Sequence, residues 1–233
     1  MAAPNNMLVK GCRNCQQQST CFNILIPEEL DFISQHKEQI VFQKGENICK
    51  QGAFANYVMY VAEGLVKTYL ETINEKTINL RIVKDTEFVG FSSLCGTKNY
   101  NYSAVSLTRS TVCLLDNESF KQLLIKNGQF SVEIMRLYCR NEAHIYKKLK
   151  SIGYKYMLGR LADTLLYLCN PEFEGYDIFK YINRKDIADF SCISKESTIK
   201  LLTDLSLNNM IKLNGPKIEI LDKPGIQNLS IKG

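Results

Sequence analysis

The sequence lacks any apolar run close to the ~20 residues that a membrane-spanning helix needs. Residues 1–10 contain no apolar core followed by a small-residue cleavage site, so we expect no secretory signal and a cytoplasmic protein. Internal repeats and low-complexity tracts are also missing. No Ser-His-Asp set, paired-carboxylate set or Cys-x-x-Cys on a βαβ background is identifiable. We therefore expect neither an enzyme nor a membrane partner.

A strong excess of one charge is missing as well. The net charge is +5, and residues 151–233 carry 11 Lys and Arg against 10 Asp and Glu. Charge alone does not indicate a nucleic-acid partner, so any positive surface must come from local placement. The composition, 45% hydrophobic and 23% charged, is that of a folded globular chain, and 233 residues are enough for two small domains.

Cysteine is the residue type that the sequence does have in unusual number. The nine cysteines are expected to be reduced thiols, in agreement with their odd count. Three of them form Cys12-x2-Cys15-x5-Cys21, a spacing of soft thiolates that suits zinc or an iron–sulfur cluster. A fourth ligand must come from the folded body, and Cys113 is the best candidate, with Cys95 as the second choice. The remaining cysteines have no partner at ligand spacing and are expected to be packing residues: Cys49, Cys139, Cys169 and Cys192.

The chain after this cysteine-rich arm divides by its local patterns. A short amphipathic helix is expected over 26–36, and short β-like runs separated by glycines over 39–116 predict an antiparallel barrel or roll. A short helix over 117–127 and a long one over about 129–151 follow, and the predicted fold class is α+β. We expect four parts: an arm at 1–25, a β-roll at 26–128, a long helix at 129–152 and a C-terminal domain at 153–233.

The long helix has apolar residues at the alternating spacing of a coiled-coil seam. This face packs either on the chain's own roll or on the same helix of a second copy, in a parallel homodimer. Glu142 lies in the seam, where an acidic residue weakens pairing unless it is shared or protonated, so Glu142 is a candidate tuning point for dimer strength. The seam consists of Met135, Tyr138, Glu142, Ile145, Leu149 and Ile152.

The C-terminal part has the pattern of a winged helix-turn-helix. After a helix over 154–168 and a short strand expected over 178–182, Asn183 caps a helix to Phe190 and Ser194 caps a second helix to about Leu207. Two short strands around Asn214-Gly215-Pro216 then predict the wing. In the second helix one face packs inward, and the other is expected to contact DNA in the major groove. The expected DNA-contacting residues are Ser194, Lys195, Glu196, Ile199 and Lys200.

Over essentially its whole length the chain resembles the CRP/FNR superfamily of bacterial regulators. The stretch Gln43-Lys-Gly-Glu with Gln51-Gly-Ala, Tyr57 and Glu63-Gly64 resembles the family's β-roll signature, and Arg184 to Leu202 resembles its helix-turn-helix. The resemblance implies a cyclic-nucleotide-binding-like roll and a homodimer that binds double-stranded DNA and contacts RNA polymerase. The family commonly has arginine where this chain has Lys195 and Lys200, and lysine cannot make arginine's bidentate contact to guanine. We therefore predict no operator sequence.

The sequence lacks the residues with which members of this family bind cyclic AMP, and it has few residues that could bind haem. Members that bind cyclic AMP carry a Gly-Glu pair and an Arg-Ser pair, but the corresponding stretches here, 88–93 and 101–104, have neither the glutamate nor the arginine. A buried phosphate without a cation is unfavourable, so we expect no cyclic AMP. Haem ranks below a cluster because only His36 and His144 are available as imidazole ligands.

The cysteine spacing is similar to that of the oxygen-sensing FNR-type branch of the superfamily. This likeness implies a [4Fe–4S] cluster on Cys12, Cys15, Cys21 and Cys113, which favours the DNA-binding dimer until oxygen converts it. Nitric oxide, which also attacks such clusters, is a second expected stimulus. Structural zinc, no metal at all, or another effector on the same fold remain the alternatives.

Overall fold

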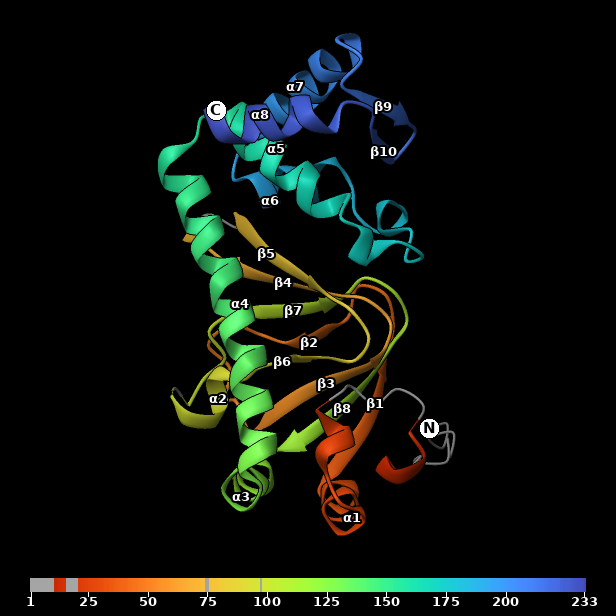
Figure 1. Cartoon of the computed structure of the whole chain (residues 1–233), viewed down its shortest axis with the longest axis vertical. Helices are drawn as coiled ribbons and strands as arrows, with labels where there is room; N and C mark the ends of the chain where they lie inside the picture. The colour runs from red at the N-terminus through yellow and green to blue at the C-terminus, as the bar shows by residue number, and fades with distance from the viewer. Residues whose placement is uncertain (1–10, 16–20, 74–75, 97) are drawn as a thin grey trace. The chain divides into compact units, whose positions relative to one another are not determined.

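The computed structural model describes residues 11–15, 21–73, 76–96 and 98–233, except for the side chains of Asn14 and Cys95. The chain divides into two compact units, Met1–Thr68 with Ile82–Arg140, and Tyr69–Arg81 with Asn141–Gly233. Figure 1 labels the helices and strands that make up each of them. No helix within the described ranges is both long enough and apolar enough to cross a membrane.

The first unit contains most of two four-stranded sheets, in the strand orders β1-β8-β3-β6 and β2-β7-β4-β5. The strands are β1 Lys37–Phe42, β2 Asn47–Cys49, β3 Tyr57–Glu63, β4 Val66–Glu71, β5 Thr77–Val83, β6 Glu87–Val89, β7 Ser103–Ser106 and β8 Ser110–Asp116. The helices are α1 Pro27–Gln35, α2 Ser92–Cys95, α3 Asn117–Lys126 and the long α4, Gly128–Tyr154, with 3-10 turns at Cys12–Asn14 and Phe22–Ile24. The expected α+β fold with an antiparallel roll is confirmed.

Strand β8 lies at the centre of the first sheet, between β1 and β3 (Figure 1). Successive side chains of a strand point to opposite faces, and both faces of β8 are apolar. Cys113 and Leu115 face a cluster formed with α1, α3 and the start of α4. Val112 and Leu114 face a second cluster, between the sheets. The sheet therefore separates two hydrophobic cores and holds Cys113 in the outer one.

Helix α4 buries one stripe and exposes another. Phe130 and Ile134 are buried in the outer core. Met135 and Leu149, on another face, are each 65% exposed in the single chain, and both belong to the apolar seam expected on this helix.

The second unit is a winged helix-turn-helix, as expected. Besides Tyr69–Arg81 and the second half of α4, its elements are α5 Met157–Leu168, α6 Arg184–Ser191, α7 Lys195–Leu207, the antiparallel pair β9 Ile211–Asn214 and β10 Lys217–Ile220, and α8 Lys223–Lys232. Helix α8 was missed from the sequence. Its signals are present, since the Asp222 carboxylate accepts a hydrogen bond from Gly225 N and Pro224 occupies the first turn.

The strand expected over 178–182 is wrong. Ile178–Lys180 forms a 3-10 helix preceded by Asp177 in the left-handed conformation, at φ 47°. Ile178 and Ile182 are both buried and lie one helical turn apart, and Ile182 N donates to Ile178 O. A short apolar run does not distinguish a strand from a helical turn, and here the packing of these side chains decides.

Gly64 provides a test of the roll's packing. Its φ is +102°, and an added Cβ would lie 2.5 Å from Ser110 Oγ and 2.8 Å from Arg109 O. We expect Gly64→Ala to lower the free energy of unfolding by about 3 kcal/mol, from positive-φ strain plus overpacking. Gly45, at φ +88° with nothing within 4 Å of such a Cβ, is the matched control, and Gly45→Ala should cost only about 1 kcal/mol. Urea unfolding measures both, and equal losses would contradict the packing argument.

Candidate functional site

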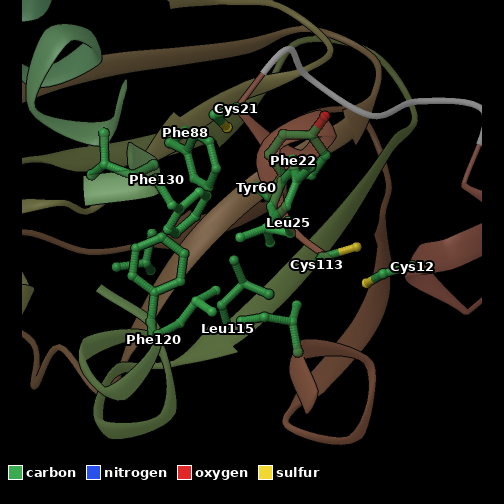
Figure 2. Packing of buried hydrophobic residues seen from close by; sticks show 14 of the residues in the cluster. Cys12, Cys21, Phe22, Leu25, Tyr60, Phe88, Cys113, Leu115, Phe120 and Phe130 are labelled. Atoms are coloured by element: carbon green, nitrogen blue, oxygen red, sulfur yellow. The ribbon is translucent and has the colours of Figure 1, made fainter. Parts of the chain in front are cut away.

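Three of the four expected ligand cysteines meet at the outer face of β8. Cys12, Cys15 and Cys113 line one small cavity of about 20 Å³, together with apolar side chains and Lys37. Figure 2 shows the thiols of Cys12 and Cys113 pointing toward each other. The arrangement brings together residues about a hundred positions apart in the sequence.

The arm that carries Cys12 is held on helix α1. Cys12 N donates a hydrogen bond of 2.7 Å to Ser34 Oγ. The Arg13 guanidinium forms a bidentate ion pair with Asp31, with its Nε 2.6 Å from Oδ1. Both partners of the arm lie on α1, so this helix positions Cys12 against β8.

The environment of Cys113 favours the neutral thiol. Burial raises the pKa of Cys113 to about 11, although the nearby Lys37 ammonium acts in the opposite direction. Lys37 Nζ lies 4.0 Å from the sulfur. A metal ligand must be a thiolate, so metal binding at Cys113 has to release a proton.

Cys21 lies apart from these three thiols. It is 2% exposed and belongs to the same hydrophobic cluster, but it does not line the cavity (Figure 2). The side chain of Cys95, the second choice for the fourth ligand, lies outside the described residues. Within the described part of the chain, no three His, Cys, Asp or Glu side chains are arranged to hold a metal ion. The donor set therefore fits a metal in part: three thiols share one cavity, and Cys21 does not.

The other described cysteines have separate environments. Cys49 is buried, and burial raises its pKa to about 12. The Cys169 thiol contacts Ile218 O at 3.7 Å. Cys192 occupies the left-handed position that ends α6, at φ 53°. Cys139 is exposed on α4, so in the single chain it is not the packing residue that we expected.

The second site is the exposed face of α7. Ser194 caps this helix by accepting a hydrogen bond of 3.0 Å from Ser197 N. Thr198, Leu202 and Leu205 are buried and fix one side of the helix to the unit. The expected DNA-contacting residues all lie on the exposed side: Ser194, Lys195, Glu196, Ile199 and Lys200.

Helix α6 begins at Asn183, the cap expected from the sequence, but sequence reasoning missed the parts that Asp186 and Arg184 play. Asn183 and Asp186 form a reciprocal cap, in which each side chain accepts a hydrogen bond from the backbone N–H of the other residue. Arg184 donates from Nη2 to Gly215 O at 2.9 Å, which ties α6 to the turn of the wing. An arginine directly after an asparagine cap was the available signal, but its partner is 31 residues away.

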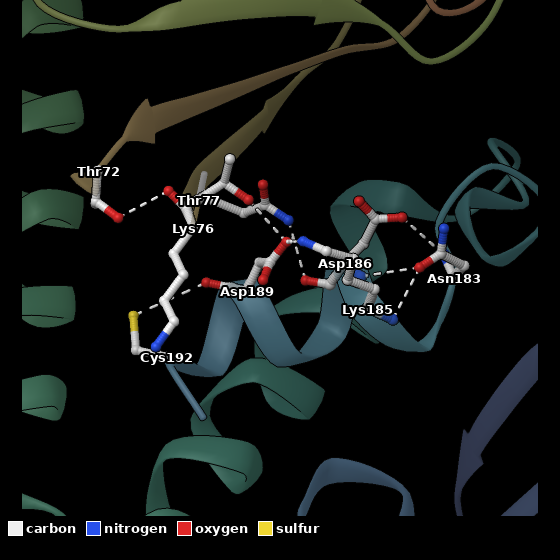
Figure 3. A network of polar contacts seen from close by, with 9 residues as sticks. Thr72, Lys76, Thr77, Asn183, Lys185, Asp186, Asp189 and Cys192 are labelled. Carbon is white, nitrogen blue, oxygen red and sulfur yellow. Dashed lines mark hydrogen bonds and ion pairs between the residues drawn. The ribbon is translucent and has the colours of Figure 1, made fainter. Parts of the chain in front are cut away.

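The β5 strand also contacts α6. Thr77 Oγ1 donates to Asp189 Oδ2 at 2.8 Å, and the buried Asn79 donates from Nδ2 to Asp186 O at 3.0 Å. Lys185 pairs with the same Asp189 along the helix (Figure 3). A strand more than a hundred residues earlier in the sequence is thus bonded directly to the first helix of the helix-turn-helix.

The seam expected on α4 is exposed in the single chain, except for Ile152, which is half-buried. Glu142, the expected tuning point, accepts a hydrogen bond of 2.8 Å from the Tyr146 hydroxyl one turn further along. A partner for the carboxylate is therefore available within the helix itself.

Comparisons with known proteins agree with this architecture. The cyclic nucleotide-binding domain family matches residues 39–127, and the Crp-like helix-turn-helix domain family matches residues 159–229. The chain is 24% identical over 210 residues to the anaerobic regulatory protein of Bacillus subtilis, covering 84% of this chain and 88% of that one. It is 24% identical over 217 residues to the transcriptional activator protein Anr of Pseudomonas aeruginosa, covering 91% and 88%.

Solved structures agree on the fold. FixK2 from Bradyrhizobium japonicum superposes with a TM-score of 0.73 at 18% identity, covering 83% of this chain and 96% of that chain. The two domain families occur here in the same order as the roll and the winged helix-turn-helix. The family expected from the sequence is confirmed: this chain belongs to the CRP/FNR family of DNA-binding transcription regulators, a family of regulators and not of enzymes.

Proposed function

We propose that this regulator responds to oxygen or redox state through a [4Fe–4S] cluster bound by Cys12, Cys15, Cys21 and Cys113. The observation that carries the proposal is the convergence of Cys12, Cys15 and Cys113 on one cavity. The name of the Bacillus subtilis relative, an anaerobic regulatory protein, supports a signal of this kind. When bound, the cluster supplies iron and sulfide that react with oxygen.

Different parts of the chain would hold the ligand cysteines in place. The β8 strand fixes Cys113, while the Arg13–Asp31 ion pair and the Cys12 N–H to Ser34 hydrogen bond hold the arm. Arg13 and Asp31 are both about half exposed, at 49% and 48%, so their ion pair is weak and reversible. Full ligation requires the Cys21 thiol to move to the cavity that the other three thiols line.

A second candidate, a structural zinc ion on the same cysteines, is favoured by the small size of the cavity. A volume of about 20 Å³ accommodates roughly one water-sized atom. Zinc is held by four ligands in structural sites, and three thiolates here would supply most of them. In this alternative the cysteines only stabilise the fold, and the regulator responds to another effector or to none.

Cyclic AMP is not the proposed ligand. Beside α4, in the first unit, a cavity of about 560 Å³ is lined by residues that include Phe91, Leu94, Ile134 and Tyr138. None of the described residues that line it is charged. A cyclic phosphate there would be buried without a cation, which is unfavourable.

We further propose that the protein acts in the cytoplasm as a homodimer that contacts RNA polymerase. The exposed seam on α4 is the proposed dimer interface, because large apolar side chains at coiled-coil spacing gain stability when a second helix covers them. The exposed side of α7 is the proposed surface for base and phosphate contacts. Glu196 suits cytosine N4, and Lys200 suits guanine or phosphate.

Lys200 tests the DNA interface. We expect Lys200→Gln to weaken DNA binding by about 1–3 kcal/mol and, if Lys200 contacts phosphate, to lower the slope of log affinity against log salt by about 1. Lys232→Gln, the same charge change on the exposed end of α8, is the control and should bind like the unmodified protein. Fluorescence anisotropy across a salt series measures both variants. Equal DNA affinities for the unmodified protein and both variants would show that Lys200 does not contact DNA.

Cys113 tests the metal site. The protein is purified without oxygen, and its visible spectrum, iron, sulfide and zinc are measured for the unmodified chain, Cys113→Ser and Cys139→Ser. We expect the unmodified chain and Cys139→Ser to contain iron and sulfide, and Cys113→Ser to lose nearly all of both. Cys139 is the control because it is exposed and lies outside the cavity.

Two results would contradict the cluster proposal. A colourless protein that holds zinc, lost only in Cys113→Ser, would establish the structural alternative. Unchanged iron in Cys113→Ser would show that the fourth ligand is another residue, with Cys95→Ser as the next variant to measure.

A further inference from the structure

The second unit contains a cavity that the cysteine site and the DNA interface do not use. Its volume is about 600 Å³, within the range of sites for small metabolites. All of its lining residues belong to the second unit and come from Leu80, the C-terminal half of α4, the link between α4 and α5, α5, the turn after α5, and α6. No lining residue belongs to α7, so this cavity is separate from the expected DNA-contacting face.

The lining is strongly cationic. Five basic side chains, Lys147, Lys148, Lys150, Lys155 and Arg160, face two carboxylates, Asp163 and Glu172. Asp163 is already engaged: it accepts from Lys155 Nζ at 2.8 Å and from the Ser151 hydroxyl at 2.5 Å, and it bonds to Ser230 as well. The remaining four cations therefore outnumber the remaining carboxylate.

Two of these cations are held in place by groups other than acids. Lys148 Nζ donates to Phe190 O at 2.6 Å and lies 5.7 Å from the centre of the Phe190 ring. Arg160 donates from Nε to Lys155 O at 2.8 Å. Across the described residues, neither cation makes an ion pair with a carboxylate.

Without a bound anion, partial burial destabilises the charged form of Lys148. Burial of Lys148 lowers the pKa of its ammonium group, because the charged form is deprived of water. Lys148 and Arg160 are both half-buried, and a bound anion would supply each of these partly desolvated cations with a charged partner. Carbonyl contacts leave further donors of both the ammonium and the guanidinium groups available to such an anion.

The apolar part of the lining indicates an organic ligand. The Tyr167 ring lies 5.1 Å from the His144 ring and 5.9 Å from the Phe190 ring, centre to centre. These three rings form an aromatic wall beside the cations. Flat apolar surface next to several positive charges suits a small molecule with a carbon skeleton and more than one oxyanion group.

We propose that this cavity binds a small organic polyanion, carrying phosphate or carboxylate groups, as a second effector of the regulator. Lys148 and Arg160 pair with its anionic groups, and the exposed Lys147 and Lys150 attract it at the entrance. Because Lys148 already bonds Phe190 on α6, an anion on Lys148 acts on the link between α4 and the helix-turn-helix. This input does not depend on the cysteines or on any metal.

The test uses the full chain, without DNA, at constant ionic strength set with sodium chloride. Inorganic pyrophosphate is titrated calorimetrically as the phosphate probe and tricarballylate as the carboxylate probe. We expect saturable binding of at least one probe, with one site per chain, and at least tenfold weaker binding by Lys148→Gln and by Arg160→Gln. Lys126→Gln, the same charge change on α3, is the matched control and should bind like the unmodified chain.

A variant with both exposed lysines changed, Lys147→Gln with Lys150→Gln, keeps the test valid if Lys148→Gln fails to fold. It should also weaken binding severalfold while its thermal unfolding stays unchanged. Preference for pyrophosphate over tricarballylate would identify a phosphorylated ligand, and the reverse preference a carboxylate. No saturable binding of either probe, or binding that is the same in Lys126→Gln and the cavity variants, would overturn the proposal. Either result leaves the cysteine proposal untouched, because no iron measurement enters it.

Discussion

The pairing of β3 with β8 determines which side chains of β8 face the N-terminal arm, and so places Cys113 beside it. Tyr60 lies opposite Cys113 in this antiparallel register, and Val58 lies opposite Leu115. A shift of one residue would turn Cys113 toward the core between the sheets and Val112 toward the arm. The register is well specified because both faces are buried in different cores, so a shift would disrupt two sets of packed side chains at once.

The DNA-binding unit combines a buried apolar core, which includes Leu161, Leu165 and Leu202, with short polar contacts. Ser194 and the Asn183–Asp186 cap set where α7 and α6 begin, and Arg184 holds the wing turn to α6. The contacts of Thr77 and Asn79 from β5 converge on the same helix α6, and so does Lys148 from α4. Helix α6 is therefore the element of this unit on which contacts from β5, from α4 and from the wing turn converge.

Much of this structure was predictable because its signals are local. Glycine-separated strands, helix caps and the Asn214-Gly215-Pro216 turn each act within a few residues, and they gave the roll and the winged helix correctly. The 3-10 turn at Ile178 and the contacts of Arg184 were not predictable, because packing and partners 31 residues away decide them. The cationic cavity was also hidden. Only folding places the lysines at the end of α4 in one cavity with Arg160 and with the rings of Tyr167 and Phe190.

The cysteines show the limit of spacing as evidence. The spacing and the family resemblance selected Cys12, Cys15, Cys21 and Cys113, and three of these line one cavity. Spacing does not tell how deeply a side chain is buried, and Cys21 lies in the core at 2% exposure. Whether Cys21 joins the other three depends on the free energy of binding a metal compared with that of burying this thiol.

The most direct test of the account is DNA affinity measured before and after air on one oxygen-free sample. A duplex selected from a random library without oxygen serves as the probe, and anisotropy is recorded while the visible absorbance is followed. We predict that affinity falls at least tenfold as the iron–sulfur absorbance disappears. Unchanged affinity while that absorbance is lost, or the absence of the absorbance from the start, would contradict oxygen sensing through these cysteines.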